Sequence, residues 1–303
     1  MGVLDRLPAW ATTGVGSLPF VDPRRAAAHA VTAYDVPFCP QLPSLEGDML
    51  VEWLGGDPRG CGWSPERDRR RPLAWDELLV ELTGRPPAHG VVKLQVTGPV
   101  TLACALERRR GALPSRRDAV ALAREAAMWL AANASAWVQA LADRGLTALL
   151  VADEPALDVF GATGLEDVWD PLRAIAPAWG LHVCCAVPWG LVERAVPDVL
   201  SFDLSLQTVD RPAALALERL LKRGGRVAWG TLAAHRPEHA LHALKRLRLA
   251  LAHVGATGEQ SLLTASCGTG RMSPVREAEV AAALAATARA LREERIDAAG
   301  HRR

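Results

Sequence analysis

The sequence predicts an α/β protein folded as a single (β/α)8 TIM barrel. Short apolar segments alternate with helix-like segments along nearly the whole chain, which is typical of a parallel sheet covered by helices. Eight segments have the character of strands, and 303 residues suit one such barrel. An open, doubly wound sheet is the main alternative because it shows the same alternation. We therefore expect one catalytic domain over residues 1–303.

Each predicted strand is a short run of apolar and often β-branched residues, bounded by glycine, proline or charged residues. The helices between them are rich in alanine. The predicted strands cover residues 11–18, 36–42, 91–96, 146–152, a stretch from His182, 199–203, 226–232 and 262–266.

Two long helices have recognisable ends. The first covers about 115–144, with Ser115 as its N-cap and Gly145 as its stop. The second begins at Pro274, a residue suited to a first helical turn, and is expected to end near Glu294. We expect residues 297–303 to form a frayed tail.

Composition excludes several classes of function. The formal net charge is +1, which argues against nucleic-acid or membrane-surface binding. The sequence contains neither an apolar run that could span a bilayer nor a signal-peptide core, so we expect a cytoplasmic protein. In that compartment the six cysteines are expected to be thiols or metal ligands, not a disulfide framework.

The fifth predicted strand carries two metal-competent side chains. Successive residues of a strand point to opposite faces, so His182 and Cys184 are expected on one face. This pair is half of a zinc site, although a buried structural role is the alternative. Asp203 and Cys267 end two later strands and are candidates for the remaining ligands. In a parallel barrel all these strand ends meet at the face where active sites lie.

Two charged segments interrupt the alternation. Residues 55–72 contain the run Arg67-Asp68-Arg69-Arg70-Arg71 and are predicted to be a long loop, either a lid or a solvated excursion. The run Arg108-Arg109-Arg110 could attract an acidic substrate or partner, but a charged helix end is the plainer interpretation.

Several motifs suggest a family. They resemble, in order, motifs of the C-terminal catalytic domain of cobalamin-independent methionine synthase, whose (β/α)8 barrel is shared with uroporphyrinogen decarboxylase. The resemblance covers about residues 12–272. The motifs are Thr13-Gly14-Val15-Gly16-Ser17-Leu18-Pro19, Val96-Thr97-Gly98-Pro99-Val100-Thr101-Leu102, Asp153-Glu154-Pro155-Ala156-Leu157, His182-Val183-Cys184 and Ser266-Cys267-Gly268.

The resemblance implies a zinc ion that activates the thiol of homocysteine. Its ligands would be His182, Cys184, Asp203 and Cys267, where the family has Glu in place of Asp203. The ammonium group of the substrate would lie near Asp153.

Three further residues are candidates for the substrate site. The substrate amino acid would also lie near Ser17, whose preceding Gly-x-Gly turn offers N–H groups to a carboxylate. His235 stands where the family keeps a proton donor, although a plain loop histidine fits equally. Trp189, just after the fifth predicted strand, is expected to line the pocket.

The methyl donor is the least determined part of the resemblance. The tryptophan on which folate stacks is replaced by Ala105, and the N-terminal half of the full-length enzyme has no counterpart in this sequence. The His-Gly-Glu motif is also absent; Pro40-Gln41-Leu42-Pro43 stands there, with Glu46 and Asp48 nearby. We therefore expect a methylcorrinoid, free or on a carrier protein, to be a better donor than methyltetrahydrofolate.

Three functions follow from these observations. The first is a zinc-dependent methyltransferase that converts homocysteine or a similar thiol into methionine or a thioether. The second is a decarboxylase of the uroporphyrinogen type, although the sequence around Ser17 lacks the expected arginine pattern. The third is a non-catalytic descendant that binds an amino acid or a metal only.

Overall fold

Strands and helices alternate along the chain as predicted. The computed structural model describes residues 2–45, 49–54, 71–110, 116–159, 163–234 and 240–300. The strands are β1 (Ala11–Thr12), β2 (Val91–Thr97), β3 (Thr147–Asp153), β4 (Ala178–Val183), β5 (Val199–Asp203), β6 (Arg226–Leu232) and β7 (Ser261–Ala265). The α-helices are α1 (Pro23–Thr32), α2 (Val51–Leu54), α3 (Trp75–Gly84), α4 (Pro99–Arg110), α5 (Arg116–Ala142), α6 (Asp170–Ile175), α7 (Trp189–Ala195), α8 (Arg211–Lys222), α9 (Ala240–Val254) and α10 (Pro274–Gly300).

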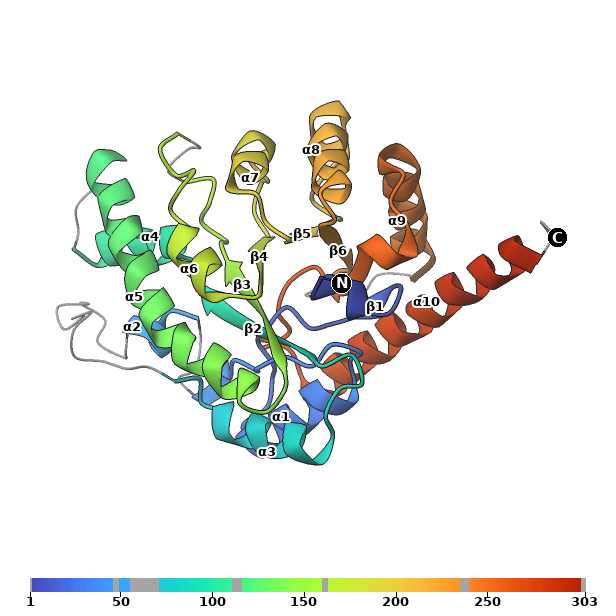
Figure 1. Cartoon of the computed structure of the whole chain (residues 1–303), viewed down its shortest axis with the longest axis horizontal. Helices are drawn as coiled ribbons and strands as arrows, with labels where there is room; N and C mark the ends of the chain where they lie inside the picture. The colour runs from blue at the N-terminus through green and yellow to red at the C-terminus, as the bar shows by residue number, and fades with distance from the viewer. Residues whose placement is uncertain are drawn as a thin grey trace.

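The strands form one curled parallel sheet. In the described part of the chain it has seven strands in the order β1-β7-β6-β5-β4-β3-β2. Every pairing is parallel, and the helices stand outside the sheet (Figure 1). The predicted α/β class is therefore confirmed, with a curled sheet like that of a TIM barrel.

The predicted eighth strand is an extended segment between the two edge strands. Residues 36–42 touch β2 through an isolated parallel bridge between Phe38 and Lys93, and the loop after β1 through a bridge between Ser17 and Gln41. On the β1 side, the Val36 N–H also donates to the Thr12 carbonyl. The predicted barrel of eight strands is thus found as seven strands plus this bridging segment.

Buried apolar residues form two clusters, one on each side of the sheet. The larger packs the outward side chains of the strands against the helices and includes Leu94, Leu150 and Leu181. The smaller lies inside the curl and includes Leu149 and Val199. Because both faces of the strands are buried, their sequences are nearly continuous apolar runs.

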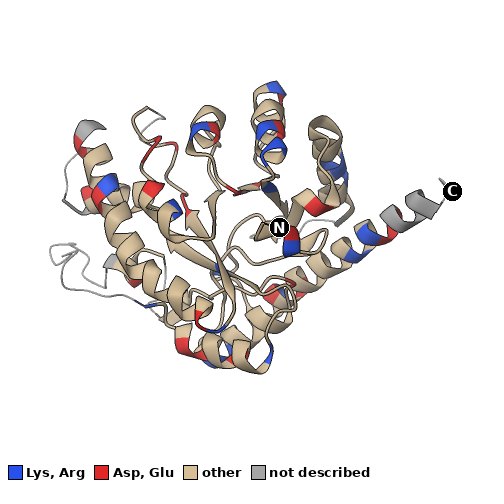
Figure 2. Ribbon diagram, in the orientation of Figure 1, with Lys and Arg blue, Asp and Glu red and all other residues tan. Residues whose placement is uncertain are grey.

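Charged side chains gather on the helices and leave the strands mostly apolar (Figure 2). The final helix runs to Gly300, beyond the predicted end near Glu294 and into the predicted tail; residues 301–303 lie outside the described part. Of the predicted lid at 55–72, only residues 71 and 72 are described. No described helix is long and apolar enough to cross a membrane.

Candidate metal centre and cavity

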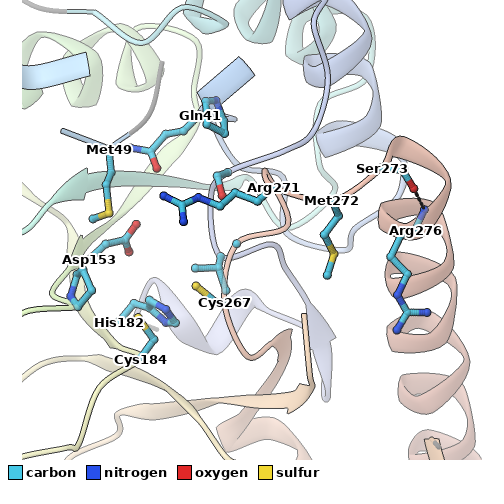
Figure 3. Close-up of a pocket in the computed structure, with 15 residues that line it drawn as sticks. Gln41, Met49, Asp153, His182, Cys184, Cys267, Arg271, Met272, Ser273 and Arg276 are labelled. Carbon is cyan, nitrogen blue, oxygen red and sulfur yellow. Dashed lines mark hydrogen bonds between the residues drawn. The ribbon is translucent and has the colours of Figure 1, made fainter. Parts of the chain in front are cut away.

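Three predicted ligands from two distant strands meet at the carboxyl-terminal end of the sheet. His182 lies near the end of β4, Cys184 directly follows β4, and Cys267 follows β7. One ligand atom from each residue lies within 4.8 Å of the ligand atoms of the other two (Figure 3). His182 and Cys184 point to the same side, as the alternation of strand side chains predicts.

The His182 ring is oriented by a neighbouring strand. Its Nδ1 lies 2.9 Å from Ser201 Oγ, and Ser201 is its register partner on β5. Its Nε2 is buried and has no hydrogen-bond partner among the described atoms. A buried polar atom without a partner is costly, and a metal-ligating histidine characteristically bonds a fixed group through its other nitrogen. The ring is therefore arranged to offer Nε2 to a metal.

The two thiols of the cluster lie close together, with their Sγ atoms within 4.8 Å of each other. The neighbouring Cys184 thiol lowers the pKa of Cys267, and the nearby His182 ring lowers it further. The interaction with Cys267 raises the pKa of Cys184. The cluster thus favours a thiolate at Cys267, the form of cysteine that binds metals.

Asp203, the fourth predicted ligand, is not among the three residues whose ligand atoms are grouped. It is the last residue of β5 and is buried, but its Oδ1 accepts a 2.7 Å hydrogen bond from the Ser205 N–H. The described cluster of ligand atoms does not include it. Asp side chains readily bond the backbone two residues on, and this local turn holds the carboxylate.

Asp153 lies beside the cluster as the register partner of His182. It is buried, and its Oδ1 has no hydrogen-bond partner among the described atoms. Burial raises the pKa of Asp153 to about 6, while the charges of Lys93 and His182 oppose that rise. Its carboxylate therefore faces the site with unused hydrogen-bonding capacity.

Lys93 is a buried cation that the sequence interpretation missed. Its Nζ donates to the Val15 carbonyl and to Gln95 Oε1. Burial lowers the pKa of Lys93 to about 8, and the charge of Asp153 opposes the shift. The signal was present in the alternation of Lys93, Gln95 and Thr97 along an otherwise apolar strand, which places three polar residues on the inner face.

Glu154 points away from the site, as expected from strand alternation. Its carboxylate accepts hydrogen bonds from the Val100 and Thr101 N–H groups, the Thr101 hydroxyl and Trp169 Nε1. Burial raises the pKa of Glu154 to about 7 against these donors. Gly98 is required here, because a Cβ at this position would lie 2.0 Å from Glu154 Cδ. Glu154 therefore fastens the start of α4 to the end of β3.

A cavity of about 850 Å³ opens above the cluster. It brings Ser17 and Asp153 together with the three metal-competent residues. Gln41, Met49 and Arg271 also line it but were not predicted, since each lies in a loop without a motif. The lining residues are Val15, Ser17, Gln41, Pro43, Met49, Asp153, Pro155, His182, Cys184, Cys267, Gly268, Arg271, Met272, Ser273 and Arg276.

Other predicted site residues lie apart from this cavity or outside the described residues. Trp189 is not among the lining residues; its ring packs edge-on against Phe202, with ring centroids 5.4 Å apart. Ala105 packs against the outer core. His235, Glu46 and Asp48 lie outside the described residues.

Comparison with known proteins identifies the fold. No protein-family model and no curated protein sequence matches the chain. Among solved structures it is similar to a B12-independent methionine synthase from Shewanella sp. W3-18-1 in complex with selenomethionine, with 20% identity and a TM-score of 0.52 over 76% of this chain and 70% of that chain. It is also similar to a methyltransferase from Methanosarcina mazei, with 14% identity and a TM-score of 0.62 over 94% of this chain and 96% of that chain.

The chain has the fold of these two proteins. The fold that the motif resemblance implied is thereby confirmed. The carboxyl-terminal strand ends, where this architecture keeps its chemistry, hold the His182–Cys184–Cys267 cluster.

Proposed function

We propose that the chain is a zinc-dependent methyltransferase whose acceptor is the thiol of homocysteine or a similar compound. The product is methionine or the corresponding thioether. The observation that carries this proposal is the His182–Cys184–Cys267 cluster, with its unpartnered Nε2, at the floor of a substrate-sized cavity. The fold shared with two methyl-transferring proteins supports it.

The residues present fit a zinc ion. One imidazole and two thiols are the nitrogen and sulfur ligands that zinc prefers, whereas magnesium or calcium would need oxygen ligands. Catalytic zinc sites keep three protein ligands and leave a position for a water or a substrate. Three ligands beside an open cavity match that pattern, and the orienting bond from Ser201 matches the outer partners of such sites.

The chemistry follows from these ligands. When bound, zinc lowers the pKa of a coordinated thiol, which would otherwise be mostly protonated at neutral pH. Ser201 holds the His182 ring, and the cavity walls position the substrate near the cluster. The substrate sulfur uses its electron pair to form the new bond to the methyl carbon. The bond between methyl and donor breaks, and its electron pair stays on the donor.

Asp153 is the proposed partner of a substrate ammonium group. Its buried carboxylate lies next to His182 and has an oxygen without a partner among the described atoms. Ser17 is proposed to shape the same pocket through its loop. Asp203 as a fourth ligand stays a prediction of the resemblance, although its hydrogen bond from the Ser205 N–H favours the three-ligand site. His235 as a proton donor and Trp189 as a pocket residue also stay predictions.

We propose a methylcorrinoid, free or held by a carrier protein, as the donor in preference to methyltetrahydrofolate. None of the described lining residues is Trp, Tyr or Phe, so the described cavity offers no aromatic platform for a pterin ring. Stacking on such a platform is worth about 1–3 kcal/mol for nucleic-acid bases. Ala105, packed against the core, is not the reason for this preference.

The test is methionine formation from homocysteine by the zinc-loaded chain, with methylcobalamin and methyltetrahydrofolate supplied separately at equal concentration. We expect about one zinc per chain and faster turnover with methylcobalamin. Faster turnover with methyltetrahydrofolate would reject the proposed methylcorrinoid donor but support the proposed methyltransferase activity. A chain that binds no zinc and transfers no methyl group would favour the decarboxylase or the non-catalytic alternative.

A further inference from the structure

The cavity contains a cation that has no partner among the described residues. Arg271 lines the cavity and makes no hydrogen bond or ion pair with any described residue. Figure 3 shows its side chain extending into the cavity on the side of Asp153, above the metal-competent cluster. Arg276, the other arginine of the lining, is instead paired with Glu279 at 3.0 Å. The two arginines therefore differ in whether their charge is already matched.

The backbone that carries Arg271 is held in place. The Ser17 carbonyl accepts hydrogen bonds from the N–H and the hydroxyl of Thr269, and Ser17 Oγ accepts one from the Gly270 N–H. The Met272 N–H then donates to the Thr269 carbonyl and closes a turn around Arg271. Because the backbone at Arg271 is already held, a ligand that binds there loses less free energy to ordering the loop.

Glycines make this close packing possible. A Cβ on Gly268 would lie 2.1 Å from Ser17 Oγ, and one on Gly270 would lie 2.8 Å from Ser17 Cβ. The loop can therefore approach Ser17 only with glycine at both positions. This close approach fixes the position of the Arg271 backbone.

No carboxylate among the described lining residues neutralises the charge of Arg271. The negative charge of Asp153 already interacts with buried Lys93 beneath it, as the opposed pKa shifts of the two groups indicate. Among the described lining residues, Asp153 is the one carboxylate, and it forms no ion pair with Arg271. Within the described lining of the cavity, the guanidinium group of Arg271 is therefore a positive charge without a matching carboxylate.

We infer that Arg271 binds an anionic carboxylate at the far end of the substrate thiol and so selects for thiols that carry one. This inference rests on the proposed function, because it takes a thiol as the substrate. A guanidinium group can hold a carboxylate through two parallel hydrogen bonds. The cluster would hold the sulfur end and Arg271 the carboxylate end of one small molecule.

The test measures binding by calorimetry, with the zinc-loaded chain and two probes of similar size. One probe is 3-mercaptopropionate, a thiol with a carboxylate; the other is cysteamine, a thiol with an ammonium group. Arg271→Ala should weaken the binding of 3-mercaptopropionate by about tenfold to a hundredfold, the usual loss for a hydrogen bond to a charged group, and leave cysteamine within about twofold.

Two further variants control the measurement. Arg271→Lys should retain part of the affinity for 3-mercaptopropionate, because it keeps the charge without the two-point contact. Arg276→Ala should leave both affinities unchanged, because that side chain is already paired.

Two results would overturn the inference. An unchanged affinity for 3-mercaptopropionate in Arg271→Ala would reject Arg271 as the carboxylate-binding residue while leaving the thiol methyltransferase intact. Binding of neither thiol by zinc-loaded wild-type chain would instead reject the thiol substrate itself, and the inference with it.

Discussion

The two ends of the curled sheet carry opposite chemistry although the same strands build both. At the amino-terminal end, the first residues of several strands form an apolar cluster closed by Leu4 and Leu7. At the carboxyl-terminal end, Asp153, His182 and Cys267 surround a cavity. Bulky apolar packing dominates one end, while the other holds His182 Nε2 and Asp153 Oδ1, which are buried and have no partner among the described residues. The comparison teaches that stability and chemistry can be altered separately in this fold.

The largest effect is expected from Cys267→Ser. A serine hydroxyl is a poor replacement for a thiolate on zinc, so zinc affinity should fall by more than about a hundredfold. Cys185→Ser is the matched control, since Cys185 lies next to Cys184 but directs its thiol toward the Glu154 carbonyl. Metal analysis after dialysis against a weak chelator measures both. Full zinc in Cys267→Ser would exclude the cluster as the metal site.

Leu149→Ala should lower stability and leave zinc binding unchanged, the opposite of the result expected for Cys267→Ser. Leu149 is 1% exposed in the inner cluster, and removing such a side chain destabilises a protein by about 2–5 kcal/mol. Denaturant unfolding measures the loss, and zinc titration of the folded variant should match that of the wild type. If zinc affinity fell in parallel with stability, the two ends would not be separable.

Ser201→Ala sharpens the comparison because Ser201 orients a ligand without being one. Loss of such an outer partner typically weakens metal binding by about tenfold to a hundredfold. Competition with a chromogenic chelator gives the affinity, and Ser205→Ala in the neighbouring loop serves as the control. An unchanged zinc affinity would mean that the Ser201–His182 bond does not position the ring.

Asp203→Asn should have the smallest effect. Asparagine keeps an oxygen that can accept the Ser205 N–H, and the carboxylate lies outside the described cluster. We expect zinc stoichiometry to stay at the wild-type value and stability to change by no more than about 1 kcal/mol. A large loss of zinc that Asp203→Glu restores would instead make this carboxylate the fourth ligand, as the sequence resemblance implied.

Sequence reasoning succeeded where local rules determine position. Strand alternation places His182 and Cys184 on one side and separates Asp153 from Glu154, and parallel strands bring their carboxyl ends together. These rules, with the motif resemblance that favoured Asp153 over Glu154, assembled Asp153, His182, Cys184 and Cys267, which lie far apart in the chain.

The same reasoning failed where tertiary contacts decide. The stretch 178–180 was not recognised as the start of β4 because Gly180 is a poor strand former; glycine is needed there, since a Cβ would lie 2.7 Å from the Val199 carbonyl. Residues 36–42 bridge two edges instead of forming a regular strand. Arg271 enters the cavity from a loop whose path depends on Ser17, and no local pattern in the sequence indicates that path.

Ser17 has a consequence for the order in which the molecule is completed during synthesis. It belongs to the loop after the first strand, yet its hydroxyl and carbonyl bond the loop after the last strand, and β1 pairs with β7. A growing chain therefore has His182 and Cys184 long before the segment that supplies Cys267 and closes the pocket. Such distant contacts form late and slowly in folding. The protein therefore acquires its cavity in the final stage of folding, when the two extremes of the chain join.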